Sequence, residues 1–182
     1  MKTSIHTRVP VFMAFMILCL PVVVLAPNLA TAETPAPSST NPIKKGSTVT
    51  SRASGTFEVK INPLTPHHKD ETAPLGRLSI DKQFQGDLDA TSTGEMLTAG
   101  TEVTGSAGYV AMERVAGKLR GRSGTFVLQH SGTMNRGSPT LSVTVVPDSG
   151  TGQLAGLDGK MTIKIEGGKH FYDFQYSLPE LP

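Results

Sequence analysis

Cysteine is almost absent from this sequence. The one thiol among 182 residues, Cys19, lies inside an apolar run near the N-terminus. Ile17 and Leu18 precede it, where a lipoprotein signal needs small residues, so we do not expect lipidation. A chain that loses this run has no thiol at all, which excludes both disulfides and a cysteine nucleophile.

An excess of basic charge is also absent once the N-terminal segment is set aside. The first 32 residues contain two of the 17 basic residues, Lys2 and Arg8, and none of the 15 acidic ones, so the remainder carries equal numbers of each. The only basic run there is Lys44-Lys45. A nucleic-acid-binding protein needs a basic patch to neutralise phosphates, and we expect no nucleic-acid partner.

Residues 1–32 have the organisation of a secretory signal peptide. A basic start is followed by an apolar run from Val9 to Ala26 and by the small-residue motif Ala30-Thr31-Ala32. We expect cleavage after Ala32, a periplasmic or secreted product, and no membrane association after cleavage. The alternative is an uncleaved membrane anchor, because the run is about long enough to span a bilayer.

The next segment, residues 33–50, is rich in Pro, Ser and Thr and poor in large apolar side chains. Such a composition buries too little surface to offset the entropy of ordering, which predicts a flexible leader. Residues 51–182 remain as one domain with a modest core.

No stretch of ten or more residues in this domain has a clean helical period. Apolar and polar residues alternate instead, and 19 glycines in the whole chain separate the runs. This pattern predicts eight strands, which cover residues 57–61, 78–84, 88–97, 106–115, 125–129, 141–145, 161–165 and 171–178.

Two hairpins have turns that predict a register. The two-residue Gly167-Gly168 loop supplies positive φ at both central positions and would pair Ile163 with Tyr172. The loop 85–87 would pair Phe84 with Leu88, and therefore Lys82 with Ala90.

Eight antiparallel strands that each have one apolar face can bury those faces by closing into a barrel, which also removes exposed sheet edges. We therefore expect an all-β fold, an eight-stranded antiparallel barrel. A β-sandwich is the alternative. The interior of an eight-stranded barrel is just wide enough for packed side chains or one small ligand.

Motifs of known chemistry are missing. Asp148-Ser149-Gly150-Thr151-Gly152 resembles a phosphate loop, but no helical pattern follows it, so we interpret it as a turn. Adjacent residues of an extended chain point in opposite directions, so His67 and His68 are poorly placed to share one metal ion. We expect no metal and no cofactor.

Polar residues on otherwise apolar strand faces are the informative signal. Lys82 is in phase with Phe84, His130 with Leu128, and both Tyr172 and Tyr176 with Phe174. A buried ammonium needs a partner or access to solvent.

Glu113, which shares a strand face with Tyr109, is the candidate partner of Lys82. The opposite face of that strand is also apolar, so the sequence leaves open which face points inward. Glu95 falls out of phase with the apolar positions of its own strand. We predict a candidate ligand-binding set of Lys82, Tyr109, Glu113, His130, Tyr172 and Tyr176. The alternative is that these are structural polar groups in a packed core.

Six segments follow one another along the domain: KQFQGDL (82–88), STGEML (92–97), GYVAMER (108–114), GRSGTFVLQH (121–130), VVPDSGTG (145–152) and LAGLDG (154–159). Together, and in this order, they resemble the bacterial family of uncharacterised proteins catalogued as domain of unknown function 3224. The resemblance extends from about Ala53 to Leu178 and implies an eight-stranded barrel like that of allene oxide cyclase. It implies no activity, and no catalytic residue of the plant cyclase matches a position here.

Three functions stay open at this point. The first is a barrel that binds one small apolar molecule. The second is an isomerase or cyclase in which Glu113, His130 or Lys82 moves a proton. The third is an interaction module without a pocket, for example a homo-oligomer.

Overall fold

The computed structural model of this chain describes residues 48–65 and 75–180. The predicted signal peptide, most of the predicted leader and the pair His67-His68 lie outside these residues.

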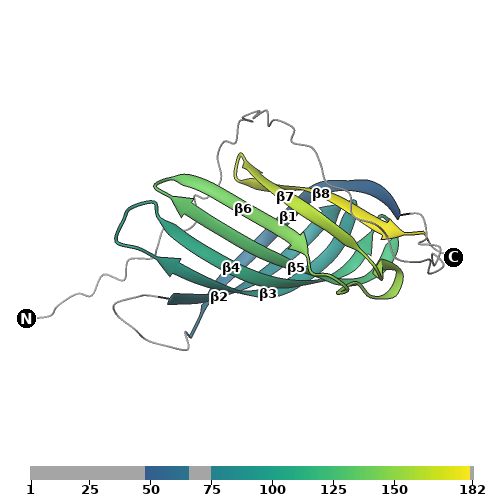
Figure 1. Ribbon diagram of the computed structural model, residues 1–182, viewed down its shortest axis with the longest axis horizontal. Coiled ribbons are helices and arrows are strands. Elements are labelled where there is room, and N and C mark those ends of the chain that lie inside the picture. The colour runs from purple at the N-terminus through teal and green to yellow at the C-terminus, as the bar shows by residue number, and fades with distance from the viewer. Residues whose placement is uncertain (1–47, 66–74, 181–182) are drawn as a thin grey trace, which may run out of the picture.

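The described residues form a closed antiparallel barrel in which each strand pairs with the next and the last pairs with the first (Figure 1). The predicted eight-stranded barrel is therefore confirmed, in place of the sandwich. The strands are β1 (Thr48–Leu64), β2 (Leu75–Gly86), β3 (Leu88–Gly100), β4 (Ala107–Leu119), β5 (Arg122–Asn135), β6 (Ser138–Val145), β7 (Asp158–Glu166) and β8 (Lys169–Pro179).

The first strand begins earlier than composition predicts. β1 starts at Thr48, three residues before the expected start of the domain at residue 51. Thr48 pairs with Pro179 on β8 and Thr50 with Ser177, so residues 48–50 belong to the barrel wall. Backbone pairing needs no apolar side chain, which explains why the composition of this segment does not reveal the strand.

Alternation along β4 settles which face of that strand points inward. Ala111, Glu113 and Val115 are buried, whereas Val110 and Met112 are more than half exposed. Glu113 therefore lies in the barrel interior, and the apolar face of Val110 and Met112 lies on the outer surface.

The Gly167-Gly168 hairpin has the predicted register. Ile163 pairs with Tyr172, and both glycines have positive φ, 57° and 76°. The β2–β3 hairpin differs: Phe84 pairs with Ala90 and Lys82 with Ser92, two residues away from the prediction. A shift of two keeps every side chain on its predicted face.

The shift in the β2–β3 hairpin arises because neighbouring strands hold the turn. The Asp87 backbone N–H donates to the carbonyl of Ser54 on β1, and the Asp87 carboxylate accepts from the Ser54 N–H at 2.9 Å. The Leu88 N–H donates to the Tyr172 hydroxyl of β8 at 2.8 Å. These bonds replace the ladder bonds that a tight three-residue loop would form.

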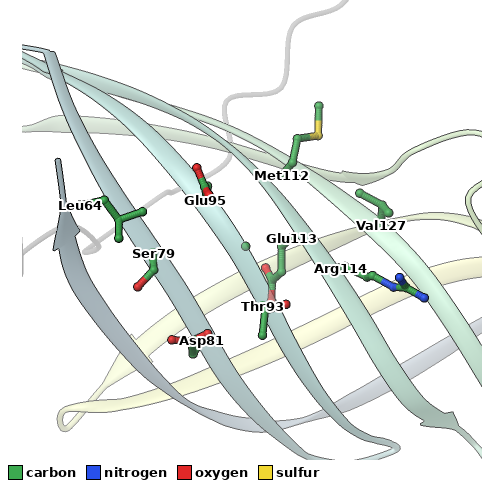
Figure 2. A pocket seen from close by; sticks show the side chains of 10 residues that line it. Leu64, Ser79, Asp81, Thr93, Glu95, Met112, Glu113, Arg114 and Val127 are labelled. Carbon is green, nitrogen blue, oxygen red and sulfur yellow. The ribbon is translucent and has the colours of Figure 1, made fainter. Parts of the chain in front are cut away.

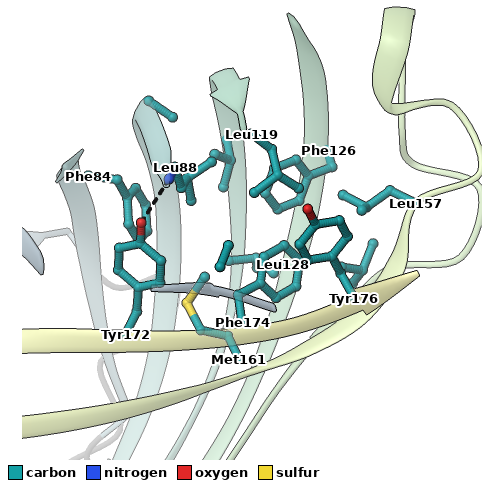
Figure 3. Packing of buried hydrophobic residues seen from close by; sticks show 14 of the residues in the cluster. Phe84, Leu88, Leu119, Phe126, Leu128, Leu157, Met161, Tyr172, Phe174 and Tyr176 are labelled. Carbon is teal, nitrogen blue, oxygen red and sulfur yellow. Dashed lines mark hydrogen bonds between the residues drawn. The ribbon is translucent and has the colours of Figure 1, made fainter. Parts of the chain in front are cut away.

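One end of the barrel, called the closed end here, is filled by side chains. The turns β2–β3 and β4–β5 and the segment 146–157 lie at this end. That segment contains a single 3₁₀ turn, Gly152–Leu154, and inserts the fully buried Leu154 and Leu157. Figure 3 shows Leu157 beside Phe126 and Tyr176, with Phe174 in the next layer. The Phe126 and Phe174 rings stack with centroids 5.9 Å apart.

The opposite end, called the open end here, includes the turns β5–β6 and β7–β8 and the loop β3–β4. Inward-facing apolar side chains at this end keep contact with solvent. Ile61, opposite the buried Ile80, is 50% exposed, and Leu141 is 38% exposed. Others at this end are half-buried, among them Val59, Leu78, Met96, Ile163 and Ile165. The described residues contain no helix long and apolar enough to cross a membrane.

Candidate functional site

Four neighbouring strands each place one polar side chain at the same level of the barrel interior. These are Lys82 on β2, Ser92 on β3, Glu113 on β4 and His130 on β5. All four are buried, and Glu113 has no exposed surface. They form what we call the interior cluster. It lies beside the buried aromatic ring of Phe84 and on the open-end side of the packed core.

The carboxylate of Glu113 is the centre of the interior cluster. Its Oε2 accepts from Lys82 Nζ at 2.6 Å and from His130 Nε2 at 2.8 Å. Its Oε1 accepts from the Ser92 hydroxyl. A carboxylate only accepts, so the proton of this contact belongs to Nε2 of His130.

A glycine on β3 lets the backbone of β4 approach closely beside Glu113. Gly94 pairs directly with Glu113. A Cβ at position 94 would overlap the carbonyl oxygen of Met112 and lie 2.9 Å from the Cα of Glu113. Any larger residue at position 94 would force Glu113 or its strand to move.

The protonation equilibrium of Glu113 follows from these contacts. Burial alone would raise its pKa, but the hydrogen bond from His130 and the positive charge of Lys82 outweigh burial and lower the pKa to about 2. Glu113 is therefore an anion throughout the physiological range, neutralised by Lys82.

Two aromatic rings cover the ammonium group of Lys82. Its Nζ lies 5.0 Å from the ring centroid of Phe57 and 5.6 Å from that of Phe84, within the range of cation–π attraction. His170 is half-buried beside Phe57, with ring centroids 5.0 Å apart. Burial lowers the pKa of His170, and the charge of Lys82 lowers it further.

Tyr109 lies between the interior cluster and the open end. It pairs with Gly132 on β5, and a Cβ on Gly132 would overlap the Tyr109 ring. Desolvation, with a smaller contribution from the charge of Glu113, raises the pKa of Tyr109 to about 12. Its hydroxyl has no hydrogen-bond partner among the described residues.

The two remaining candidate tyrosines lie apart from the cluster. The Tyr172 hydroxyl accepts from the Leu88 N–H and donates to the Gln85 carbonyl at 3.3 Å, so it supports the β2–β3 turn. Tyr176 packs at the closed end, 5.3 Å between ring centroids from Phe174. Strand alternation predicts that both tyrosine side chains point inward. Their distance from Lys82 depends instead on the position of each tyrosine along β8.

The pairing of Lys82 with Glu113 is confirmed, and His130 joins the same carboxylate. Ser92 and His170 are the residues that sequence analysis missed. The phase of Ser92 with Leu88 and Ala90 was a usable signal, since it placed the hydroxyl on the inner face. Glu95 faces outward and pairs with Arg77 at 2.6 Å, in agreement with its predicted phase.

A shallow hollow of about 610 Å³ lies on the outer wall over β1–β5 (Figure 2). Outward-facing side chains such as Asp81, Thr93 and Arg114 line it, and it meets the interior cluster only where Gly94 and Glu113 form its floor. Within 48–65 and 75–180, no group of three His, Cys, Asp or Glu side chains is placed to hold a metal ion.

Comparisons with known proteins agree with the barrel. The family model described as "Protein of unknown function (DUF3224)" matches residues 53–176. A crystal structure from Shewanella oneidensis MR-1, described as a protein with unknown function from the DUF3224 family, is 48% identical. That match covers 72% of this chain and 100% of the other, with a TM-score of 0.68. No curated protein matches the chain. The resemblance to allene oxide cyclase stays a prediction. The chain belongs to the DUF3224 family of proteins of unknown function.

Proposed function

We propose that this protein binds one small, mostly apolar molecule in the open end of the barrel. The observation that carries the proposal is the unequal filling of the interior. Core aromatics and Leu154 and Leu157 fill the closed end, whereas inward-facing Ile61 and Leu141 stay 50% and 38% exposed at the other. Apolar groups that face a barrel interior and still touch water gain free energy when an apolar ligand covers them.

The interior cluster suits binding better than proton transfer. Glu113 accepts hydrogen bonds from three donors and has a pKa of about 2, so at neutral pH it is a weak proton acceptor. An efficient general base has a pKa near the working pH. The charged groups therefore support a role in orienting a ligand at the inner limit of the apolar surface.

A tryptophan reporter tests the proposal, because the chain contains no tryptophan of its own. Leu141→Trp places an indole on the inner face of the open end. Leu97→Trp is the matched control, because Leu97 is also an exposed leucine, at 57%, but faces outward. With decanol as the probe, the emission of the Leu141→Trp variant should move to shorter wavelength and saturate, as the ligand displaces water from the indole. The Leu97→Trp variant should not respond.

An equal response of the two variants would indicate nonspecific adsorption, and no response from either would show that the open end does not take up an apolar molecule. Either result contradicts the proposal.

A further inference from the structure

The interior charges restrict the chemistry of a ligand head group, if the proposed function holds. Lys82 and Glu113 are the buried charged side chains among the described residues, and they lie 2.6 Å apart. Their charges cancel. A ligand that brings an additional charge to this level would leave that charge uncompensated in a buried environment, which is costly.

The unused hydrogen-bonding capacity of the interior cluster restricts the head group further. Both carboxylate oxygens of Glu113 are occupied, so Glu113 has little capacity left for a cationic head group. Lys82 has three N–H donors and uses one of them on Glu113. Tyr109 has a hydroxyl without a partner among the described residues, and a hydroxyl can both donate and accept.

From this arrangement we infer that the ligand has an uncharged, oxygen-bearing head group, a carbonyl or a hydroxyl, held by the spare donors of Lys82 below an apolar body. A carbonyl oxygen accepts from Lys82. A hydroxyl accepts from Lys82 in the same way and also donates to an acceptor such as the hydroxyl oxygen of Tyr109. Carboxylates and amines of the same length fit less well because each adds a net charge to the interior.

The test compares four probes with the same ten-carbon chain at pH 7: a methyl ketone, a primary alcohol, a carboxylate and a primary amine. Each displaces the uncharged fluorophore N-phenylnaphthylamine from the wild-type protein. The ketone or the alcohol should bind most tightly, with the carboxylate and the amine about tenfold weaker or more. Whichever of the ketone and the alcohol has the higher affinity then indicates whether the site prefers a carbonyl or a hydroxyl head group.

A charge variant provides the second arm. Glu113→Gln leaves Lys82 without its counter-charge, so the carboxylate should become the tightest of the four probes. Lys82→Met/Glu113→Gln removes both charges and should retain the apolar contribution to binding. With decane added as a fifth probe, this variant should lose most of the wild type's preference for the ketone over decane. This double variant keeps the test usable where Glu113→Gln fails to fold.

The outcomes separate the two proposals. If neither the fluorophore nor any probe binds, the proposed function fails. If the probes bind but the carboxylate or the amine equals or exceeds the uncharged heads in the wild type, the binding function stands and the inference about the head group is wrong. An unchanged preference for the ketone over decane in the double variant likewise contradicts the role given to Lys82.

Discussion

Lys82 on β2 reaches past β3 to Glu113 on β4, and its Nζ lies 2.6 Å from Oε2 of that carboxylate in the barrel interior. Neither side chain has appreciable exposure, at 5% and 0%. Each therefore depends on the other, because a single buried charge is far more costly than the pair.

Removing one member of this pair should be strongly destabilising. We expect Lys82→Met to lower the free energy of unfolding by about 3–5 kcal/mol, because it leaves the Glu113 anion without its counter-charge. Urea denaturation measures this, with Lys60→Met on the outer face of β1 as a control that changes stability by about 0.5 kcal/mol or less.

The second substitution of the pair should restore much of that loss. Lys82→Met/Glu113→Gln has no buried charge, and the amide oxygen still accepts from His130. If Lys82→Met alone were as stable as the wild type, the ion pair would not matter for stability.

Stability should fall in acid through Glu113. Its pKa is about 4.5 in an unfolded chain and about 2 in the barrel, so the unfolded state takes up the proton first as the pH falls. The contribution is complete above about pH 4.5, is lost progressively towards pH 2, and amounts to about 3 kcal/mol at most. Urea midpoints measured from pH 7 to pH 2 test this. The Lys82→Met/Glu113→Gln variant should show a shallower decline, and parallel pH profiles would contradict the assignment to Glu113.

The two tyrosine hydroxyls of β8 should differ in importance. Tyr172→Phe removes the acceptor of the buried Leu88 N–H and should cost about 1–3 kcal/mol. It should also speed hydrogen exchange at the Leu88 amide. Tyr176→Phe is the matched control, because its hydroxyl has no partner among the described residues, and it should be nearly neutral. Equal effects of the two substitutions would refute the role of Tyr172 in holding the turn.

Position 132 should need a glycine because the ring of Tyr109 fills the space of a side chain there, and not because of the backbone conformation of β5. Gly132→Ala should destabilise the protein by about 1–3 kcal/mol, because the methyl group overlaps that ring. In a Tyr109→Leu background the same substitution should cost much less. A double-mutant cycle measures the coupling, and strict additivity of the two substitutions would rule out this contact as the reason for the glycine.

The mass of the exported protein tests whether the predicted signal peptide is cleaved. We expect the protein made in a Sec-competent host to begin at Glu33, because Ala30-Thr31-Ala32 offers a small-residue cleavage motif after an apolar run. Intact-protein mass spectrometry of the periplasmic fraction measures the start. A chain that retains Met1 and sediments with the inner membrane would contradict cleavage.

Sequence alone determined the features that depend on neighbouring residues. Alternation with a period of two placed Lys82 and His130 on inner faces, since successive side chains of a strand must point to opposite sides. The Gly167-Gly168 turn predicted its own register because a two-residue loop with positive φ has few geometries. The need of a buried ammonium for a counter-ion made Glu113 the candidate partner of Lys82, although it did not decide which face of that strand points inward.

Only the tertiary structure decided the features that depend on distant strands. Both faces of β4 contain apolar residues, so its alternation alone does not show which face is buried. Closure of the barrel buried the face with Glu113. The β2–β3 register moved by two residues because Ser54 and Tyr172, remote in sequence, hold the turn. The level of each side chain along the barrel axis is likewise absent from a strand pattern, and it is this level that separates Tyr172 and Tyr176 from the interior cluster. Phase is a local property of one strand, whereas level is set by the register of all eight.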